Sequence, residues 1–360
     1  MLAAPLQQVD RTCVRHGRRT LAYFGGCDYF RLASHPKVLR AMETGLRKFG
    51  LNVAASRLTT GNHELYGKLE TELASFFSRE SAVLVPTGYA TNLIAAQALA
   101  GQFTHVLIDE KAHPSLCDAA KFFGCRIIQF KHRDAADLSR VLARCGKNPK
   151  PILLTDGMFS HDGSIAPLAE YQTRLPTGSW MLVDEAHSGG TLGATGRGAL
   201  ELEGVDPRRI VQTITLSKAF GVYGGAILCS RKFAGEIFAK SKMFVGSTPL
   251  PLPLANAALA SIAVLRTDKS LRRRLARNVD YTKAKLRTAG FPVVDSPSPL
   301  IAHVPGNAKG AAALRKRCLA HGIFPSFIKY PGGPENGYFR FAISSEHSKA
   351  QLDALLKVLV

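Results

Sequence analysis

The sequence predicts an α/β protein, with a large domain around a mostly parallel sheet of seven strands and a smaller α+β domain after it. Two observations predict this class. Short apolar runs of strand length alternate with amphipathic segments of helix length up to Lys242, and continuous apolar runs are typical of parallel strands buried on both faces. The pattern then changes at a proline-rich stretch, where a second domain is expected.

The expected strands are the apolar runs at residues 81–85, 106–108, 126–130, 151–155, 180–183, 210–216 and 225–229. Helices are expected between them at residues 64–77, 90–100, 115–123 and 135–145. Strands that alternate with helices in this way form a parallel sheet with helices on both faces. In such a sheet the ligand site is expected at the carboxyl ends of the strands.

The second domain is expected after residues 247–253, because prolines there interrupt the chain before two long helical stretches at 254–265 and 269–289. Two strands, around 300–304 and 338–343, and a last helix at 349–359 are expected to follow. The predicted division is an N-terminal segment of residues 1–36, a large domain of residues 37–250 and a small domain of residues 251–360.

Composition restricts the class of protein. The chain has 360 residues, 46% of them hydrophobic, which is enough for a large core. The seven cysteines are scattered and form no Cys-x-x-Cys pair, so we expect no metal site, no disulfides and a reducing, cytoplasmic location. No apolar stretch approaches the roughly 20 residues that a membrane span requires, so no membrane partner is expected.

Two strand ends carry the residue types that pyridoxal phosphate chemistry requires. Asp184 follows one apolar run, with His187 three residues later, and Lys218 follows the next run. Lysine is poorly suited to a buried strand end unless its amine is used. The Lys218 amine can form an imine with the cofactor, and Asp184 can keep the pyridine nitrogen protonated, so that the ring accepts electrons.

Three more strand ends add polar groups. Thr87, Gly88 and Tyr89 join a strand to a helix, and the free amides of a helix N-terminus suit a phosphate. His113 follows another strand end, where its ring can stack on an aromatic cofactor, and Ser160 lies in a polar segment after the next strand. Taken singly, such residues are more commonly caps, turns or surface groups. Together they predict one polar crevice at the sheet edge.

A nucleic-acid helicase is the alternative from a different class of protein. The residues at 184–187 match its Asp-Glu-Ala-His motif, and the formal net charge of +20 permits an acidic partner. However, the chain contains no GxxxxGK[ST] phosphate loop, and its basic residues are dispersed without interleaved aromatic residues. We therefore expect no nucleic-acid partner.

The order of these motifs resembles the α-oxoamine synthases, a family of fold-type I pyridoxal-phosphate transferases, over nearly the whole chain. The matching segments are residues 56–70, 87–89, 113–115, 156–163, 184–187, 215–218 and 247–248, together with Arg340. The resemblance implies that Lys218 carries the cofactor as an internal aldimine and moves the α-proton of the substrate. It also implies that Asp184 pairs with the pyridine nitrogen, that His187 bonds the phenolic oxygen and that His113 stacks on the ring.

The resemblance also assigns the phosphate site. The turn of Thr87, Gly88 and Tyr89 and the hydroxyl of Thr215 would hold the phosphate, joined by Thr248 of the partner subunit. A homodimer with a shared active site is therefore implied.

On the substrate side, the resemblance assigns Arg340 to the carboxylate of the amino acid, since a guanidinium binds a carboxylate bidentately. Ser160 would lie near the ring and the substrate, and Cys27 near the substrate carboxylate. The implied reaction joins an amino acid to an acyl thioester. The resemblance favours L-alanine as the amino acid and a pimeloyl group as the acyl chain, carried by coenzyme A or an acidic carrier protein. The products are an α-amino ketone, CO2 and a free thiol.

The chain departs from the family pattern at three places. Cys27 stands where the family usually has asparagine, residues 52–55 replace a glycine-rich run, and Tyr66 replaces a histidine. Three alternative functions therefore stay open: a synthase that uses glycine or serine, an aminotransferase, or a relative with altered activity.

Overall fold

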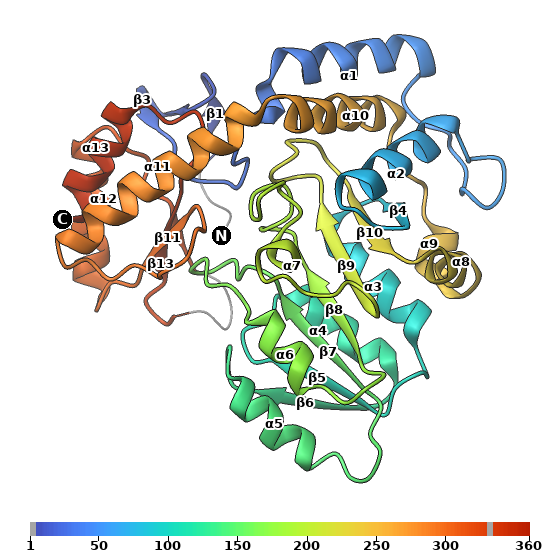
Figure 1. Cartoon of the computed structure of the whole chain (residues 1–360). Coiled ribbons are helices and arrows are strands. Elements are labelled where there is room, and N and C mark those ends of the chain that lie inside the picture. The colour runs from blue at the N-terminus through green and yellow to red at the C-terminus, as the bar shows by residue number, and fades with distance from the viewer. Residues whose placement is uncertain (1–4, 330–333) are drawn as a thin grey trace. The chain divides into compact units, whose positions relative to one another are not determined.

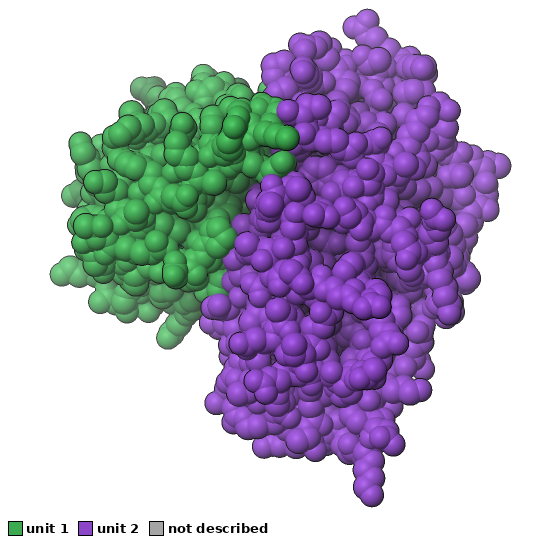
Figure 2. Space-filling model, in the orientation of Figure 1, with its two compact units in different colours: residues 1–34, 160–164, 268–360 green, residues 35–159, 165–267 purple. Residues whose placement is uncertain are grey.

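The structure is a computed structural model that describes residues 5–329 and 334–360. The chain forms two compact units (Figure 2). The large unit consists of residues 35–159 and 165–267, and the small unit of residues 1–34, 160–164 and 268–360. Within the described ranges, none of the helices combines the length and the apolar content needed to cross a bilayer.

A seven-stranded sheet forms the middle of the large unit (Figure 1). In spatial order its strands are β4 (Ser81–Val85), β10 (Gly225–Cys229), β9 (Ile210–Thr215), β8 (Trp180–Asp184), β7 (Pro151–Asp156), β5 (His105–Asp109) and β6 (Arg126–Phe130). β10 is antiparallel to both of its neighbours, and the other neighbouring pairs are parallel. The predicted α/β class with a mostly parallel sheet is confirmed.

The helices of the large unit are α1 (Pro36–Phe49), α2 (Glu64–Phe76), α3 (Gly88–Leu99), α4 (Pro114–Ala120), α5 (Ala135–Ala143), α6 (Leu168–Arg174), α7 (Ala199–Leu202), α8 (Arg231–Lys240), α9 (Lys242–Gly246) and α10 (Leu252–Thr267). The short 3-10 turn η2 (Lys121–Phe123) follows α4. Helices α3, α4 and α8 pack on one face of the sheet, and α6 and α7 lie over the other (Figure 1).

This coverage explains the continuous apolar runs in the sequence. Successive side chains of a strand point to opposite faces of a sheet. Leu153 and Leu154 are neighbours on β7, and both are fully buried. Because apolar side chains are needed on both faces, the strands show no alternation with polar residues.

Helix α10 belongs to the large unit, which differs from the predicted boundary at residues 250/251. It packs along α1 and α2, and the Asn256 amide donates to the carbonyl oxygen of Ala41 at 2.7 Å. The structure divides the chain at residues 267/268 instead. The prolines at residues 249–253 redirect the chain but do not end the hydrophobic core.

The small unit contains two three-stranded antiparallel sheets. One has β1 (Gln7–Gln8), β2 (Cys13–His16) and β3 (Arg19–Ala22), and the other has the order β11 (Leu300–His303), β13 (Tyr338–Ala342) and β12 (Phe327–Ile328). Its helices are α11 (Lys269–Thr288), α12 (Ala308–Ala320) and α13 (Lys349–Leu359), with the 3-10 turn η1 (Leu32–Ser34).

The N-terminal residues are part of the small unit rather than a separate segment. The amide of Ala342 donates to the carbonyl oxygen of Phe24 at 2.6 Å, and the amide of Ser345 donates to that of Tyr29 at 2.9 Å. The strands β1 to β3 were not predicted, because they are short and mostly polar, so they show no apolar run.

Candidate active site

The topology brings five predicted strand ends to one edge of the sheet. Strands β4, β5, β7, β8 and β9 all run in one direction, so their carboxyl ends lie together. Asp156 and Asp184 are direct neighbours at the ends of β7 and β8, and Asp184 pairs with Thr213 on β9. The expected position of the ligand site at this edge therefore has a structural basis.

A pocket of about 240 Å³ lies at this edge, wholly within the large unit. It is lined by Gly88, Tyr89, His113, Ser115, Asp156, Asp184, Ala186, His187, Thr215, Ser217 and Lys218. Seven predicted cofactor residues are thus brought together: the lysine, the aspartate, both histidines and three residues of the phosphate set. Thr87 is the N-cap beside them.

The N-terminus of α3 forms one wall of this pocket. The Thr87 hydroxyl accepts from the amide of Ala90 at 3.1 Å. The amides of Gly88 and Tyr89 belong to the first turn of α3, where backbone amides have no acceptor within the helix. A Cβ at Gly88 would lie 2.6 Å from the Cβ of Thr215 and 2.7 Å from its Oγ1. Only glycine allows the helix N-terminus to approach the end of β9 this closely. Two free amides beside a hydroxyl suit a phosphate group.

Thr215 already uses its hydroxyl within the protein. Its Oγ1 donates to the carbonyl oxygen of Gly224 at 3.1 Å and accepts from the amide of Ser217 at 3.2 Å. The two bonds fix the turn that leads from β9 to Lys218. Thr215 therefore shapes the pocket wall, and its predicted contact with a phosphate stays a prediction.

Two carboxyl groups differ in their surroundings although they are neighbours. Asp184 accepts from the Asn92 amide at 2.7 Å and from the backbone amide of Ala186 at 2.9 Å. Asp156 accepts from the backbone amide of His113 at 2.8 Å, and burial, together with the charge of Asp184, raises the pKa of Asp156 well above its usual value. These surroundings favour a neutral Asp156.

His113 lies at the N-cap of α4, directly after the end of β5. Burial lowers the pKa of its imidazole, and the charge of Lys218 lowers it further, while the charge of Asp184 raises it. The ring of Tyr89 meets the His113 ring edge-on, with 6.1 Å between centroids. The Tyr89 hydroxyl donates to Asp118 at 2.6 Å, and this bond, with burial, raises the pKa of Tyr89 to about 12. Both aromatic groups are therefore uncharged at neutral pH.

Glu185 anchors the loop that carries His187. It is fully buried and accepts from the hydroxyl of Ser188 and from the amides of Ala199, at 2.7 Å, and Leu200, at 2.9 Å. Burial raises the pKa of Glu185 to about 7. The acidic residue after Asp184 thus caps α7 rather than lining the pocket.

The predicted substrate residues lie in the small unit. Arg340 is in the middle of β13, and its Nη1 donates to the carbonyl oxygen of Ser160 at 2.8 Å. Cys27 and Arg340 both act electrostatically on the buried hydroxyl of Tyr29, whose pKa is raised well above its usual value chiefly by burial. Ser160, Cys27 and Arg340 are therefore brought together around one region of this unit.

Thr248 and Tyr66, two further residues considered in the sequence, do not line the pocket. Thr248 is exposed in the segment after α9 and does not line the pocket of its own chain. Tyr66, one of the departures from the family pattern, is fully buried and donates to the carbonyl oxygen of Leu250 at 2.7 Å. Tyr66 has a packing role, and the predicted contribution of Thr248 to a partner's site is not tested by a single chain.

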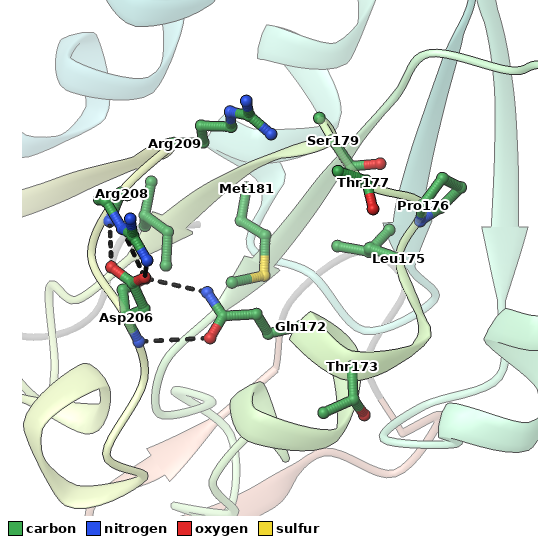
Figure 3. Close-up of a pocket in the computed structure, with 12 residues that line it drawn as sticks. Gln172, Thr173, Leu175, Pro176, Thr177, Ser179, Met181, Asp206, Arg208 and Arg209 are labelled. Carbon is green, nitrogen blue, oxygen red and sulfur yellow. Dashed lines mark hydrogen bonds and ion pairs between the residues drawn. The ribbon is translucent and has the colours of Figure 1, made fainter.

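A larger hollow of about 520 Å³ lies at the opposite edge of the sheet, around the starts of β8 and β9 (Figure 3). There Gln172 and Asp206 exchange two hydrogen bonds, of 2.9 and 3.2 Å, and Arg208 pairs with Asp206. No predicted site residue lines this hollow. The predicted cofactor residues line the smaller pocket at the carboxyl edge instead.

The match to known proteins agrees with this geometry. Residues 25–359 match the aminotransferase class I and II family. The 8-amino-7-oxononanoate synthase of Thioalkalivibrio sulfidiphilus (strain HL-EbGR7) is 36% identical over 358 residues, which cover 99% of this chain and 90% of the relative.

Two solved structures share the fold. A structure of serine palmitoyltransferase (SPT) with the pyridoxal phosphate internal aldimine has a TM-score of 0.91 at 27% identity, covering 98% of this chain and 90% of the other. The 8-amino-7-oxononanoate synthase of Francisella tularensis has a TM-score of 0.81 at 25% identity, covering 94% and 96%.

An α/β fold with an amine, a buried carboxylate and a helix N-terminus around one pocket defines a pyridoxal-phosphate-dependent transferase. The chain belongs to the aminotransferase class I and II family and, within it, to the α-oxoamine synthases, which are C-acyltransferases. The predicted family, fold type, cofactor and enzyme class are confirmed.

Four polar residues in or near the pocket are absent from the predicted site: Asn92, Ser115, Asp156 and Ser217. The sequence does indicate Asp156 as a candidate, since it ends an apolar strand as Asp184 does. The sequence indication for Asn92 is weaker: it is a polar residue on a largely apolar helix, four positions after Gly88. Ser115 follows His113 by two residues, which is also the spacing of a simple helix start.

The glycine at the start of α3 allows a direct test of the phosphate site. We expect Gly88→Ala to weaken pyridoxal phosphate binding by roughly 10- to 100-fold, because moving the helix N-terminus loses a charge-assisted hydrogen bond. The dissociation constant is measured by absorbance titration. Gly67→Ala is the control: Gly67 lies on α2 with open space around it, so this change should leave binding unchanged and stabilise the fold by about 0.5–1 kcal/mol. Equal binding by wild type and Gly88→Ala would contradict the assignment.

Proposed function

We propose that this enzyme condenses L-alanine with a pimeloyl thioester, carried by coenzyme A or an acidic carrier protein, to give 8-amino-7-oxononanoate, CO2 and the free thiol. The observation that carries the proposal is the pocket in which Lys218, Asp184 and the N-terminus of α3 meet. The identity of 36% to an 8-amino-7-oxononanoate synthase supports this choice of substrates.

The fit of the cofactor follows from the donor set of the pocket. Lys218 would hold the cofactor covalently, and the amides of Gly88 and Tyr89 would bind its phosphate. Asp184, which accepts two hydrogen bonds from the protein, would keep the proton on the pyridine nitrogen. Bound pyridoxal phosphate supplies an electron sink that stabilises negative charge at the α-carbon of the amino acid.

The remaining residues of the pocket would orient the ring and move protons. His187 would donate to the phenolic oxygen, and the partly buried, uncharged His113 would stack on the ring face. The freed amine of Lys218 would take the proton from the substrate α-carbon and return it at the end of the cycle. The charge of +20 on the chain favours acidic substrates such as coenzyme A thioesters.

Arg340 would bind the carboxylate of the amino acid, with Ser160 and Cys27 as its neighbours in the small unit. We expect Arg340→Ala to raise KM for the amino acid by roughly 10- to 100-fold with a smaller effect on kcat, because it removes a charged hydrogen bond to the bound substrate. Steady-state thiol release measures both constants. Arg18→Ala, at an exposed position of the same unit, is the control. An unchanged KM in Arg340→Ala would show that another group binds the carboxylate.

A homodimer with a shared site is also part of the proposal, with Thr248 of the partner subunit contacting the cofactor phosphate. The exposure of Thr248 in the single chain supports this, since a residue that serves a neighbour must be accessible before assembly.

The experiment that tests the function is a thiol-release assay that crosses alanine, glycine and serine with pimeloyl, acetyl and palmitoyl thioesters. Both coenzyme A and acyl carrier protein are used as carriers. The proposal expects the highest kcat/KM for alanine with a pimeloyl thioester, and CO2 in equal amount to the thiol. Preference for another pair would assign a different member of the family. Consumption of a keto acid without thiol release would indicate an aminotransferase.

A synthase that uses serine is the second candidate. Cys27 replaces the asparagine usual near the substrate carboxylate, and the SPT structure has the same fold over 98% of this chain. The serine and palmitoyl arms of the assay decide between the two candidates.

A further inference from the structure

Asn92 is a buried amide that joins four elements of the large unit. It lies on α3, one turn after Gly88, and none of its surface is exposed. Its Nδ2 donates to Oδ2 of Asp184 at 2.7 Å and to Oγ of Ser115 at 2.9 Å, and its Oδ1 accepts from the hydroxyl of Thr213 at 2.7 Å. Both N–H groups and the carbonyl oxygen are therefore used.

The carboxylate of Asp184 decides which way this amide points. In the reverse orientation, the carbonyl oxygen of Asn92 would face a carboxylate oxygen, and two buried acceptors would meet without a proton between them. The second oxygen of Asp184 accepts from the backbone amide of Ala186 at 2.9 Å. Donors on two different oxygens fix the plane of the carboxylate.

The same amide orders the imidazole of His113. Ser115 Oγ accepts from Asn92, so the hydroxyl proton of Ser115 is directed to Nδ1 of His113, 2.7 Å away. The backbone amide of Ser115 also points to this Nδ1, at 3.2 Å. Because Nδ1 accepts, the neutral ring carries its proton on Nε2.

We propose that Asn92 is a positioning residue of the cofactor site, which holds the Asp184 carboxylate and the His113 ring as one hydrogen-bonded unit and so sets the affinity for the protonated pyridine ring. This inference rests on the proposed function, in which that ring lies against Asp184. The residues that orient metal ligands offer a measure of such an effect, since losing one typically weakens binding by about 10- to 100-fold.

The other ionisable groups around this unit come from the neighbouring strands. Asp156 on β7 and Glu185 after β8 are buried. Burial raises the pKa of both groups, and the negative charge of Asp184 raises it further. His187 and Lys218 line the same pocket. Since substitutions at Asn92 leave all of these groups in place, the variants isolate the contribution of the amide.

Two variants of the full chain test the inference, with pyridoxal phosphate as the probe. Asn92→Leu has a similar volume but makes none of the three hydrogen bonds, and we expect the dissociation constant for the cofactor to rise about 10- to 100-fold. Asn92→Asp keeps the shape but places a carboxyl group against Asp184. We expect it to bind the cofactor more weakly at about pH 8 than at about pH 6, where a protonated carboxyl can again donate to Asp184.

The matched control is Gln97→Leu on the same helix. Gln97 Oε1 accepts from the hydroxyl of Ser241 at 2.8 Å and from the amide of Met243 at 3.1 Å, away from the pocket. This change removes partly buried hydrogen bonds of a side-chain amide on the same helix and should leave cofactor affinity and the pH dependence of the visible absorption unchanged.

The outcomes separate this inference from the proposed function. Wild-type affinity and an unchanged pH dependence in Asn92→Asp would overturn the role of Asn92, whether or not Asn92→Leu folds. Equal weakening by Gln97→Leu would overturn it too, because the effect would then belong to the helix as a whole. Failure of the wild-type protein to bind pyridoxal phosphate would contradict the proposed function itself.

Discussion

Replacing Lys218 by alanine is expected to lower thiol release by about 10⁴-fold or more, because the variant loses both the covalent link to the cofactor and the proton carrier. A positioned acid–base group alone contributes typically 10²- to 10⁴-fold, and the covalent step adds to this. Lys218 follows the end of β9 and lines the pocket with Asp184 and His113. None of the other residues that line the pocket carries an amine.

The control is Lys232→Ala, at an exposed position on α8 of the same unit. It should keep wild-type activity and the visible absorption of bound cofactor, while Lys218→Ala should lose both. Activity within tenfold of wild type in Lys218→Ala would be incompatible with the proposed chemistry.

Asp184→Asn is expected to lower kcat by roughly 10²- to 10⁴-fold while the protein stays folded. The change keeps the shape of the side chain, but its single carbonyl oxygen can accept from only one of the two donors, Asn92 or Ala186. It also removes the negative charge that would face the pyridine nitrogen. Breaking a buried ion pair by removing one partner costs about 3–5 kcal/mol, and each 1.36 kcal/mol corresponds to a factor of ten in rate. The kinetic constants and the absorption spectrum of the bound cofactor are the measurements.

The neighbouring carboxyl is the matched control. Asp156 is expected to be neutral, and asparagine at this position can still accept from the amide of His113. Asp156→Asn should therefore cost much less activity than Asp184→Asn. The opposite order would mean that Asp156, and not Asp184, faces the cofactor.

The carboxyl edge of the sheet could be predicted from the sequence because strand direction follows from alternation with helices. Once β7, β8 and β9 are parallel, the residues that end them must lie side by side, whatever the details of packing. Lys218 and Asp184 could be recognised as a pair for this reason, although more than 30 residues separate them in the chain.

The roles of Asn92 and Ser115 could not be predicted in the same way. Each depends on which side chain of a neighbouring element faces it, and helical periodicity does not reveal this. The unit boundary also escaped prediction, because α10 follows a proline-rich break yet packs on α1 and α2. Where packing decides, local sequence signals are insufficient.

The central claim is that Lys218 carries pyridoxal phosphate. Borohydride reduction of the purified protein loaded with pyridoxal phosphate, followed by peptide mass mapping, tests it most directly. We expect one modified peptide, containing Lys218, and loss of that modification in Lys218→Ala. A cofactor fixed on a different lysine, or a protein left unmodified after loading and reduction, would contradict the account.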